Sequence, residues 1–202
     1  RLSLVGSEMC IRDRYLSDPK HPNVFNGKAV VFEGPEDYHK RLNSKKLKID
    51  EKSILIIRGC GPVGYPGSAE VVNMQPPDRL LKKGVRHLPT LGDGRQSGTS
   101  ESPSILHVSP ESAVGGDLGI VKTGDKMKID LNKRRVDLLI TKSEFKKRRK
   151  NKKKFKVINQ TPWQEIFRNT VGQLDDGACV NSIDKYFDCL LYTSDAADDS
   201  LR

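Results

Sequence analysis

The chain has 202 residues, of which 35% are hydrophobic and 31% are charged, and its formal net charge is +10. This length suits one domain with a buried core, and the composition favours a globular domain over a disordered chain. Because no apolar run approaches the roughly 20 residues that cross a bilayer, and the first residues lack a secretory signal, we expect a cytoplasmic protein without a membrane partner.

The two ends of the chain differ from the rest. Residues 9–13 read MCIRD and residues 189–194 read CLLYTS. DNA encoding these two strings is reverse-complementary over most of its length and matches the inverted end of a transposon adapter used in sequencing libraries. We therefore expect residues 1–14 and 189–202 to be adapter-derived tails around a native domain at 15–188, which leaves only Cys60 and Cys179, too few for a disulfide framework or a thiolate metal cluster.

The first half of this domain predicts two strands. The run AVVF at 29–32 has strand length, and a turn at Gly34 and Pro35 precedes a short helical pattern. The run SILIIRG at 53–59 predicts a strand buried on both faces, which leads into the Gly- and Pro-rich loop GCGPVGYPGSAEV at 59–71. A loop that leaves a buried strand is a common place for a functional site.

The second half predicts a connection, three strands and two helices. Residues 85–104 have few apolar side chains and predict a long ordered loop or turn-rich connection. Strands are expected around 118–121, 126–130 and 135–140. Ser143 is expected to cap one helix, and Thr161, with Pro162 first in the helix and Glu165 near the capping-box position, to begin another. This mixture predicts an α+β domain built around a β-barrel or strongly curved sheet.

Three motifs resemble one enzyme family. They are GPVGYPGSAEV at 61–71, GDGRQSGTSESPSILHVSPESAVGGDLGIVKTGD at 92–125 and TPWQEIFRNTVGQLDDGACV at 161–180. Their order and content resemble the C-terminal domain of the dihydroxy-acid dehydratase and phosphogluconate dehydratase family. GYPGSAEV and GRQSGTS are more similar to the branch acting on aldonic acids, such as arabonate or xylonate, than to the branch of branched-chain amino-acid synthesis.

The resemblance implies a hydro-lyase that converts a 2,3-dihydroxy acid into a 2-keto acid. The proton beside a carboxylate is a weak acid, so the reaction needs a divalent cation, Mg²⁺, and a base within hydrogen-bond reach. The departing hydroxyl needs a Lewis acid, which in this family is an iron–sulfur cluster bound by cysteines of an N-terminal domain. That domain is not part of this sequence, so we expect the chain alone to be inactive.

The resemblance also implies site residues. Glu70 becomes a magnesium ligand, although from sequence alone it could cap a helix beginning at Ala69. Ser97 matches the family's base, whereas serines in Gly-rich loops usually bond to backbone. Arg95, Gly98 and Thr99 are expected either to bind the substrate carboxylate or to have a structural role in the loop. Close backbone approach is expected at Gly61, Gly64 and Gly67, and Glu101 departs from the small residue usual in the family.

Other readings of the sequence concern partners. The basic run KKRRKNKKKFK at 146–156 could bind nucleic acid, but it has a single aromatic residue and fits a solvated helix face better. The chain could also be a non-catalytic structural module. We expect a small sugar acid as substrate, a homo-oligomer at full length and no nucleic-acid partner.

Overall fold

A mixed six-stranded sheet forms the centre of the protein. The structure is a computed structural model that describes residues 23–67, 70, 74–95, 103–152, 154–157 and 160–180. The strand order is β4-β3-β2-β1-β5-β6, parallel from β1 to β4 and antiparallel from β1 through β5 to β6. The strands are β1 (Val24–Glu33), β2 (Ser53–Arg58), β3 (Thr90–Gly92), β4 (Ser104–Ile105), β5 (Lys126–Asp130) and β6 (Arg135–Leu138).

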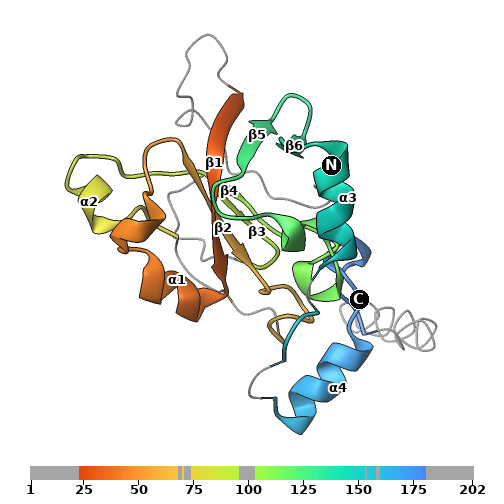
Figure 1. Ribbon diagram of the computed structural model, residues 1–202. Helices are drawn as coiled ribbons and strands as arrows, with labels where there is room; N and C mark the ends of the chain where they lie inside the picture. Colours follow the sequence, from red (N-terminus) through yellow and green to blue (C-terminus); the bar gives the residue numbers. More distant parts are fainter. Residues whose placement is uncertain are drawn as a thin grey trace, which may run out of the picture.

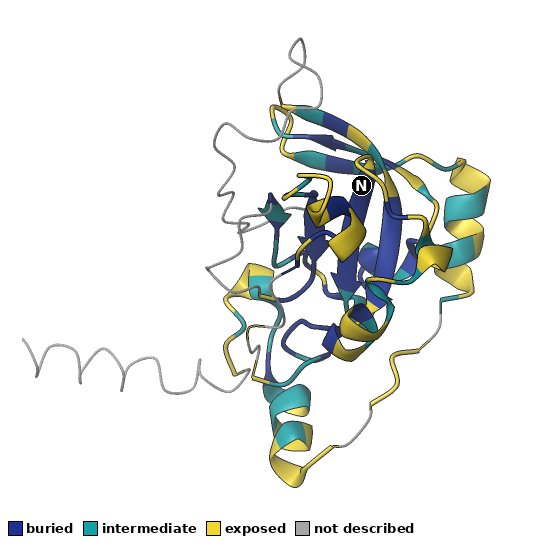
Figure 2. Ribbon diagram, turned by 90° about the vertical axis from the view of Figure 1, so that its left-hand side faces the viewer, coloured by how far each residue is buried: buried dark blue, intermediate teal, exposed yellow. Residues whose placement is uncertain are grey.

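Both faces of the central strands β1 and β2 carry a buried core. Along β2, Ile54 and Ile56 enter one core, while Leu55 and Ile57 enter a second core on the opposite face. The first core is continuous from strand β4 at one edge of the sheet to β6 at the other, so the sheet curves into a half-barrel around it. Figure 2 shows the central strands as the buried core of the molecule, with partly exposed residues along the antiparallel edge. The expected α+β class with a strongly curved sheet is confirmed.

Helices cover the sheet unevenly. They are α1 (Pro35–Arg41), α2 (Asp78–Leu81), α3 (Lys142–Lys150) and α4 (Pro162–Thr170). Tyr38 of α1 and Leu80 of α2 complete the second core, so these two helices cover that face of the sheet. In Figure 1, α3 lies on the side of the molecule away from α2, and α4 extends at the bottom of the view.

The two strands expected in the first half are confirmed. The run at 29–32 lies within β1, and Gly34 and Pro35 lead directly into α1. Strand β2 coincides with the run at 53–59 and is almost entirely buried. Among the later strands, β5 matches the expected 126–130, and β6 covers the first part of 135–140.

Two expectations for the second half are wrong. The segment 85–104 is not only a connection, because it contains β3 and the start of β4. These strands have three and two residues, too few to show a strand pattern in the sequence. The run at 118–121 is not a strand but lies largely in the 3-10 helix η3 (Asp117–Ile120). Its turn places Leu118 and Val121, three residues apart, in the same core, whereas neighbouring residues of a strand alternate between faces.

The helix caps also differ from expectation. Helix α3 is capped by Thr141, whose hydroxyl accepts a hydrogen bond from the Glu144 amide at 3.2 Å, and not by Ser143. Thr161 caps α4 as expected, but its capping-box partner is Gln164 and not Glu165. In both helices the N-cap hydroxyl meets the amide three residues later, which sets the register.

The basic run begins in α3, where one of its cations is turned toward the protein. The Arg148 guanidinium donates to Asp125 at 2.5 Å and to Glu144 at 2.7 Å, and these carboxylates raise the pKa of Arg148. The lysines at 146, 147 and 150 are exposed. In the part of the chain that the structure describes, no helix has the length and apolar character needed to span a membrane.

Candidate functional site

The candidate site lies where the parallel strands end. Strands β1 to β4 run in the same direction, so their carboxyl ends meet at one edge of the sheet. The segments that leave β2, β3 and β4 at this edge are 59–67, 93–95 and 106–112. They include parts of two motifs that the sequence singled out.

Asp93 joins these three segments. Asp93 directly follows β3 in the chain and is fully buried. It accepts hydrogen bonds from the amides of Gly59 at 3.0 Å and Cys60 at 2.9 Å, and from the amide and hydroxyl of Ser112 at 2.9 and 2.5 Å. These four donors satisfy the carboxylate without a cationic side chain, so Asp93 fixes the start of the Gly- and Pro-rich loop.

Glu111 holds the next part of the same loop. It too is fully buried, and it accepts hydrogen bonds from the amides of Val63 and Gly64, each at 2.8 Å. Burial raises the pKa of Glu111, while these amides and the Gln173 side chain act in the opposite direction. A Cβ at Gly61 would lie only 2.6 Å from Glu111 Oε2, so the loop can approach this carboxylate only with glycine at that position.

The segment around and after α4 closes against these loops. Gln173 Nε2 donates to Glu111 Oε1 at 2.9 Å, and Gln173 Oε1 accepts from the Glu111 amide at 2.9 Å. Ser109 donates to Asp175 at 2.5 Å, and Arg168 Nε donates to the Val63 carbonyl at 2.8 Å. The third motif of the sequence therefore contacts the loop formed by the first.

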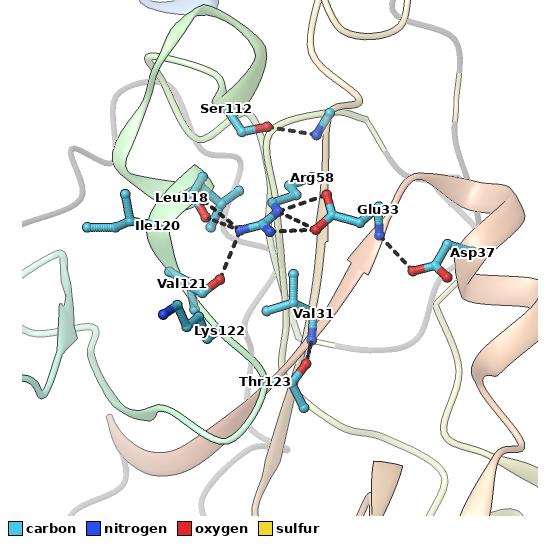
Figure 3. Close-up of polar contacts among 12 residues, drawn as sticks. Val31, Glu33, Asp37, Arg58, Ser112, Leu118, Ile120, Val121, Lys122 and Thr123 are labelled. Carbon is cyan, nitrogen blue, oxygen red and sulfur yellow. Dashed lines mark hydrogen bonds and ion pairs between the residues drawn. The ribbon is translucent and has the colours of Figure 1, made fainter. Parts of the chain in front are cut away.

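Arg58 holds the neighbouring strand ends together (Figure 3). Its Nε donates to both carboxylate oxygens of Glu33 at 3.1 and 3.0 Å. Its Nη1 donates to three carbonyls, those of Leu118, Gly119 and Val121, at 2.9–3.1 Å. This arginine thus fixes η3 beside the ends of β1 and β2.

Two of the predicted site residues, Glu70 and Arg95, lie together at this edge of the sheet, where both are exposed to solvent. Glu70 and Arg95 pair as an isolated parallel β-bridge, and Arg95 Nη2 lies 3.3 Å from Glu70 Oε1. Their side chains are 48% and 50% exposed, so a solute can reach both. The pair places a carboxylate and a guanidinium, which suit a hard cation and an acidic substrate respectively, next to each other.

The other predicted site residues divide into two groups. Ser97, Gly98 and Thr99 lie outside the described residues, as do Glu101 and the expected tails at 1–14 and 189–202. The backbone at Gly61 lies close to the Glu111 side chain, as expected. The backbone at Gly64 lies close to Gly59, since a Cβ at Gly64 would be 2.6 Å from the Gly59 carbonyl oxygen. Gly67 instead has a positive φ of 87° with open space around it, so a turn requires this glycine.

Of the two expected cofactors, the described side chains offer a partial set of ligands for Mg²⁺ and no set for an iron–sulfur cluster. The carboxylate of Glu70 offers oxygen to Mg²⁺, but a full shell needs further oxygens, and the described residues contain no cluster of three potential metal ligands. Cys60 is fully buried, and burial raises the pKa of its thiol, while Cys179 is exposed. Within the described ranges, these cysteines do not form a set that could hold an iron–sulfur cluster.

Sequence reasoning missed the residues that shape this edge, namely Asp93, Glu111, Ser112 and Gln173. Asp93 had a usable signal, because an acidic residue between two glycines directly follows a short apolar stretch. Glu111 had none, since SPES reads as a polar turn, and its partners lie 47 to 62 residues away in the chain.

Comparison with known proteins gives consistent matches. The family model described as Dihydroxy-acid/6-phosphogluconate dehydratase C-terminal matches residues 10–178. D-xylonate dehydratase of Caulobacter vibrioides is 54% identical over 92% of this chain, and L-arabinonate dehydratase of Rhizobium leguminosarum bv. trifolii is 46% identical over 63%. Dihydroxy-acid dehydratase of Thermodesulfovibrio yellowstonii is 39% identical over 76%. The chain spans only 31%, 22% and 28% of these three relatives.

Proposed function

This chain belongs to the dihydroxy-acid/6-phosphogluconate dehydratase C-terminal family, and we propose that it is the C-terminal part of a hydro-lyase that converts an aldonic acid into a 2-keto-3-deoxy acid. The membership confirms the resemblance that the three motifs indicated. Two of the relatives named above are, by their names, dehydratases of xylonate and arabinonate, which supports an aldonic acid as substrate.

The contact between Glu70 and Arg95 carries the proposal. The two residues come from separate motifs, yet they meet at 3.3 Å on the accessible side of the strand ends. A guanidinium at this position can bind a substrate carboxylate through two parallel hydrogen bonds. Ser97 follows Arg95 by two residues in the sequence, so the proposed base and the proposed carboxylate-binding residue belong to one short segment.

The proposed reaction removes the proton from C2 and the hydroxyl from C3, and the resulting enol becomes the 2-keto acid. Ser97 takes the proton, Arg95 with Gly98 and Thr99 orients the substrate, and Glu70 would hold the magnesium ion. When bound, Mg²⁺ would stabilise negative charge on the substrate and lower the pKa of a nearby hydroxyl. An iron–sulfur cluster, expected on the N-terminal domain of the full-length enzyme and not on this chain, would supply a Lewis acid for the hydroxyl.

The test uses the full-length protein, obtained by extending the gene upstream in the source DNA. We expect 2-keto acid from xylonate, arabonate or gluconate with Mg²⁺ under anaerobic conditions. Ser97→Ala should abolish turnover, while Ser143→Ala, the same change on the exposed surface of α3, should not. Normal turnover by Ser97→Ala, or no 2-keto acid from any polyhydroxy acid, would contradict the proposal.

A dihydroxy-acid dehydratase of branched-chain amino-acid synthesis is the second candidate. It is favoured by the 39% identity to the dihydroxy-acid dehydratase of Thermodesulfovibrio yellowstonii. Including a branched-chain 2,3-dihydroxy acid in the same assay separates the two, because the preferred substrate has the higher kcat/KM. A cytoplasmic location and a homo-oligomeric full-length enzyme stay predictions.

We also infer that residues 15–188 are the native part of the chain and that the two ends derive from adapter. The upstream and downstream source DNA tests this directly, since native coding sequence in place of MCIRD and CLLYTS would support the inference. Finding these strings in the genomic locus would contradict it.

A further inference from the structure

We infer that Glu111 and Gln173 are positioning residues for the loop that leads to Glu70, and that through this loop they set the affinity of the site for its divalent cation. The inference rests on the proposed function, because it takes Glu70 as a ligand of that cation. Neither residue contacts the substrate in this scheme.

The first step of the argument is the way Glu111 is used. Its Oε1 accepts from the Val63 amide and from Gln173 Nε2, and its Oε2 accepts from the Gly64 amide. All three distances are 2.8–2.9 Å, and the side chain is fully buried. A buried carboxylate that loses such a donor is strongly destabilised, so the loop and Glu111 hold one another in a single arrangement.

The second step is the double contact made by Gln173. One amide side chain pairs with both the backbone and the carboxylate of Glu111, so it fixes the position of the residue and the direction of its side chain. Arg168, from the same C-terminal segment, donates to the carbonyl of Val63. Val63 is therefore held through its amide by Glu111 and through its carbonyl by Arg168.

The third step links this arrangement to the cation. Glu70 follows the described part of the loop by three residues. Its side chain is half exposed and its backbone pairs with Arg95, so its place depends on the two loops at this edge and not on core packing. The backbone that precedes it is fixed at Val63 and Gly64. Since Mg²⁺ requires near-octahedral oxygen geometry, movement of that backbone misplaces the ligand. Loss of groups that orient metal ligands typically lowers metal affinity about 10- to 100-fold.

The test compares Gln173 variants in the full-length protein. After chelation, Mg²⁺ binding is measured by calorimetry, and exchange of the Val63 and Gly64 amides is measured in the same samples. We expect Gln173→Ala to raise the Kd for Mg²⁺ about tenfold and to speed exchange at both amides, with kcat at saturating Mg²⁺ within about twofold of the parent. Gln173→Glu should weaken binding further, because it sets a second carboxylate against Glu111.

Gln75→Ala is the matched control, since this exposed glutamine is held by the Tyr38 hydroxyl through its backbone amide and carbonyl, which the substitution leaves in place, and it should change neither readout. Milder changes at Gln173 avoid the folding defect expected for Glu111→Ala. Faster amide exchange with an unchanged Kd would overturn the inference, as would unchanged exchange or a folded parent that binds no Mg²⁺. If the expected Mg²⁺ pattern is found in a protein that forms no 2-keto acid, the proposed function fails and the positioning role stands.

Discussion

Replacing Asp93 with asparagine tests whether this carboxylate holds the strand ends together. Its Oδ2 accepts from the Gly59 amide and from both the amide and the hydroxyl of Ser112, and its Oδ1 accepts from the Cys60 amide. Asparagine can keep its oxygen at the Oδ2 position. Its NH₂ group must then face the Cys60 amide, so that two buried donors meet without an acceptor.

The expected cost follows from these four contacts. Two buried donors left without an acceptor cost about 1–3 kcal/mol each. The three bonds that persist lose their charge assistance, about 1 kcal/mol each, and the relief from no longer burying a charge offsets this loss of roughly 3 kcal/mol. We therefore expect Asp93→Asn to lower the free energy of unfolding by about 3 kcal/mol.

Urea unfolding of the chain measures this change. With an m-value of about 2 kcal/mol/M, the midpoint should fall by about 1.5 M. Asp137→Asn is the matched control, because Asp137 is only partly buried and pairs with the exposed Arg135 on strand β6, and such an ion pair contributes about 1 kcal/mol or less. A midpoint shift below about 0.5 M for Asp93→Asn, or equal shifts for the two variants, would refute the role given to Asp93.

Three further predictions concern the loop, its carboxylate and the helix caps. Gly61→Ala places a Cβ 2.6 Å from Glu111 and should lower the melting temperature by about 4–8 °C, from a cost of about 2 kcal/mol, in calorimetry. Burial raises the pKa of Glu111 in the folded protein above its ordinary 4.5, so the folded protein holds this proton more tightly than the unfolded chain does. The resulting contribution to the free energy of unfolding is complete below pH 4.5 and declines as the pH rises above it, because the unfolded chain loses the proton first. Glu111→Gln should therefore lose less stability than the parent as the pH rises above 4.5 in urea titrations; parallel curves would contradict this. Thr141→Ala should cost about 1 kcal/mol in thermal unfolding, and Ser143→Ala clearly less, with equal losses counting against the assigned cap.

Sequence patterns predicted the central strands because those strands carry their own signal. Strands β1 and β2 contain continuous apolar runs, and residues 29–32 and 53–57 are buried on both faces of the sheet. Strands β3 and β4 lack such runs, at three and two residues, and exist because Leu55 of β2 pairs with Thr90, which in turn pairs with Ser104. Pairings of this kind between distant segments leave no local periodicity.

The candidate site was predictable only where a motif resembled a family. Glu70 and Arg95 were named from such motifs, and the structure brings them together at 3.3 Å. Spacing alone would not have paired them, because their contact depends on the loops after β2 and β3 reaching the same edge of the sheet. The burial of Glu111 depends on a contact with Gln173, 62 residues later, which no local pattern encodes.

The contact between Gln173 and Glu111 also sets an order of events during synthesis. A ribosome translates from the N-terminus, at about 5–20 residues per second, so all six strands are made before Gln173. The sheet can therefore pair while the loop after β2 still lacks its last partner. A nascent chain released before residue 173 would have the complete sheet with Glu111 short of one donor, and such a product offers quality-control proteases an opened loop at this edge.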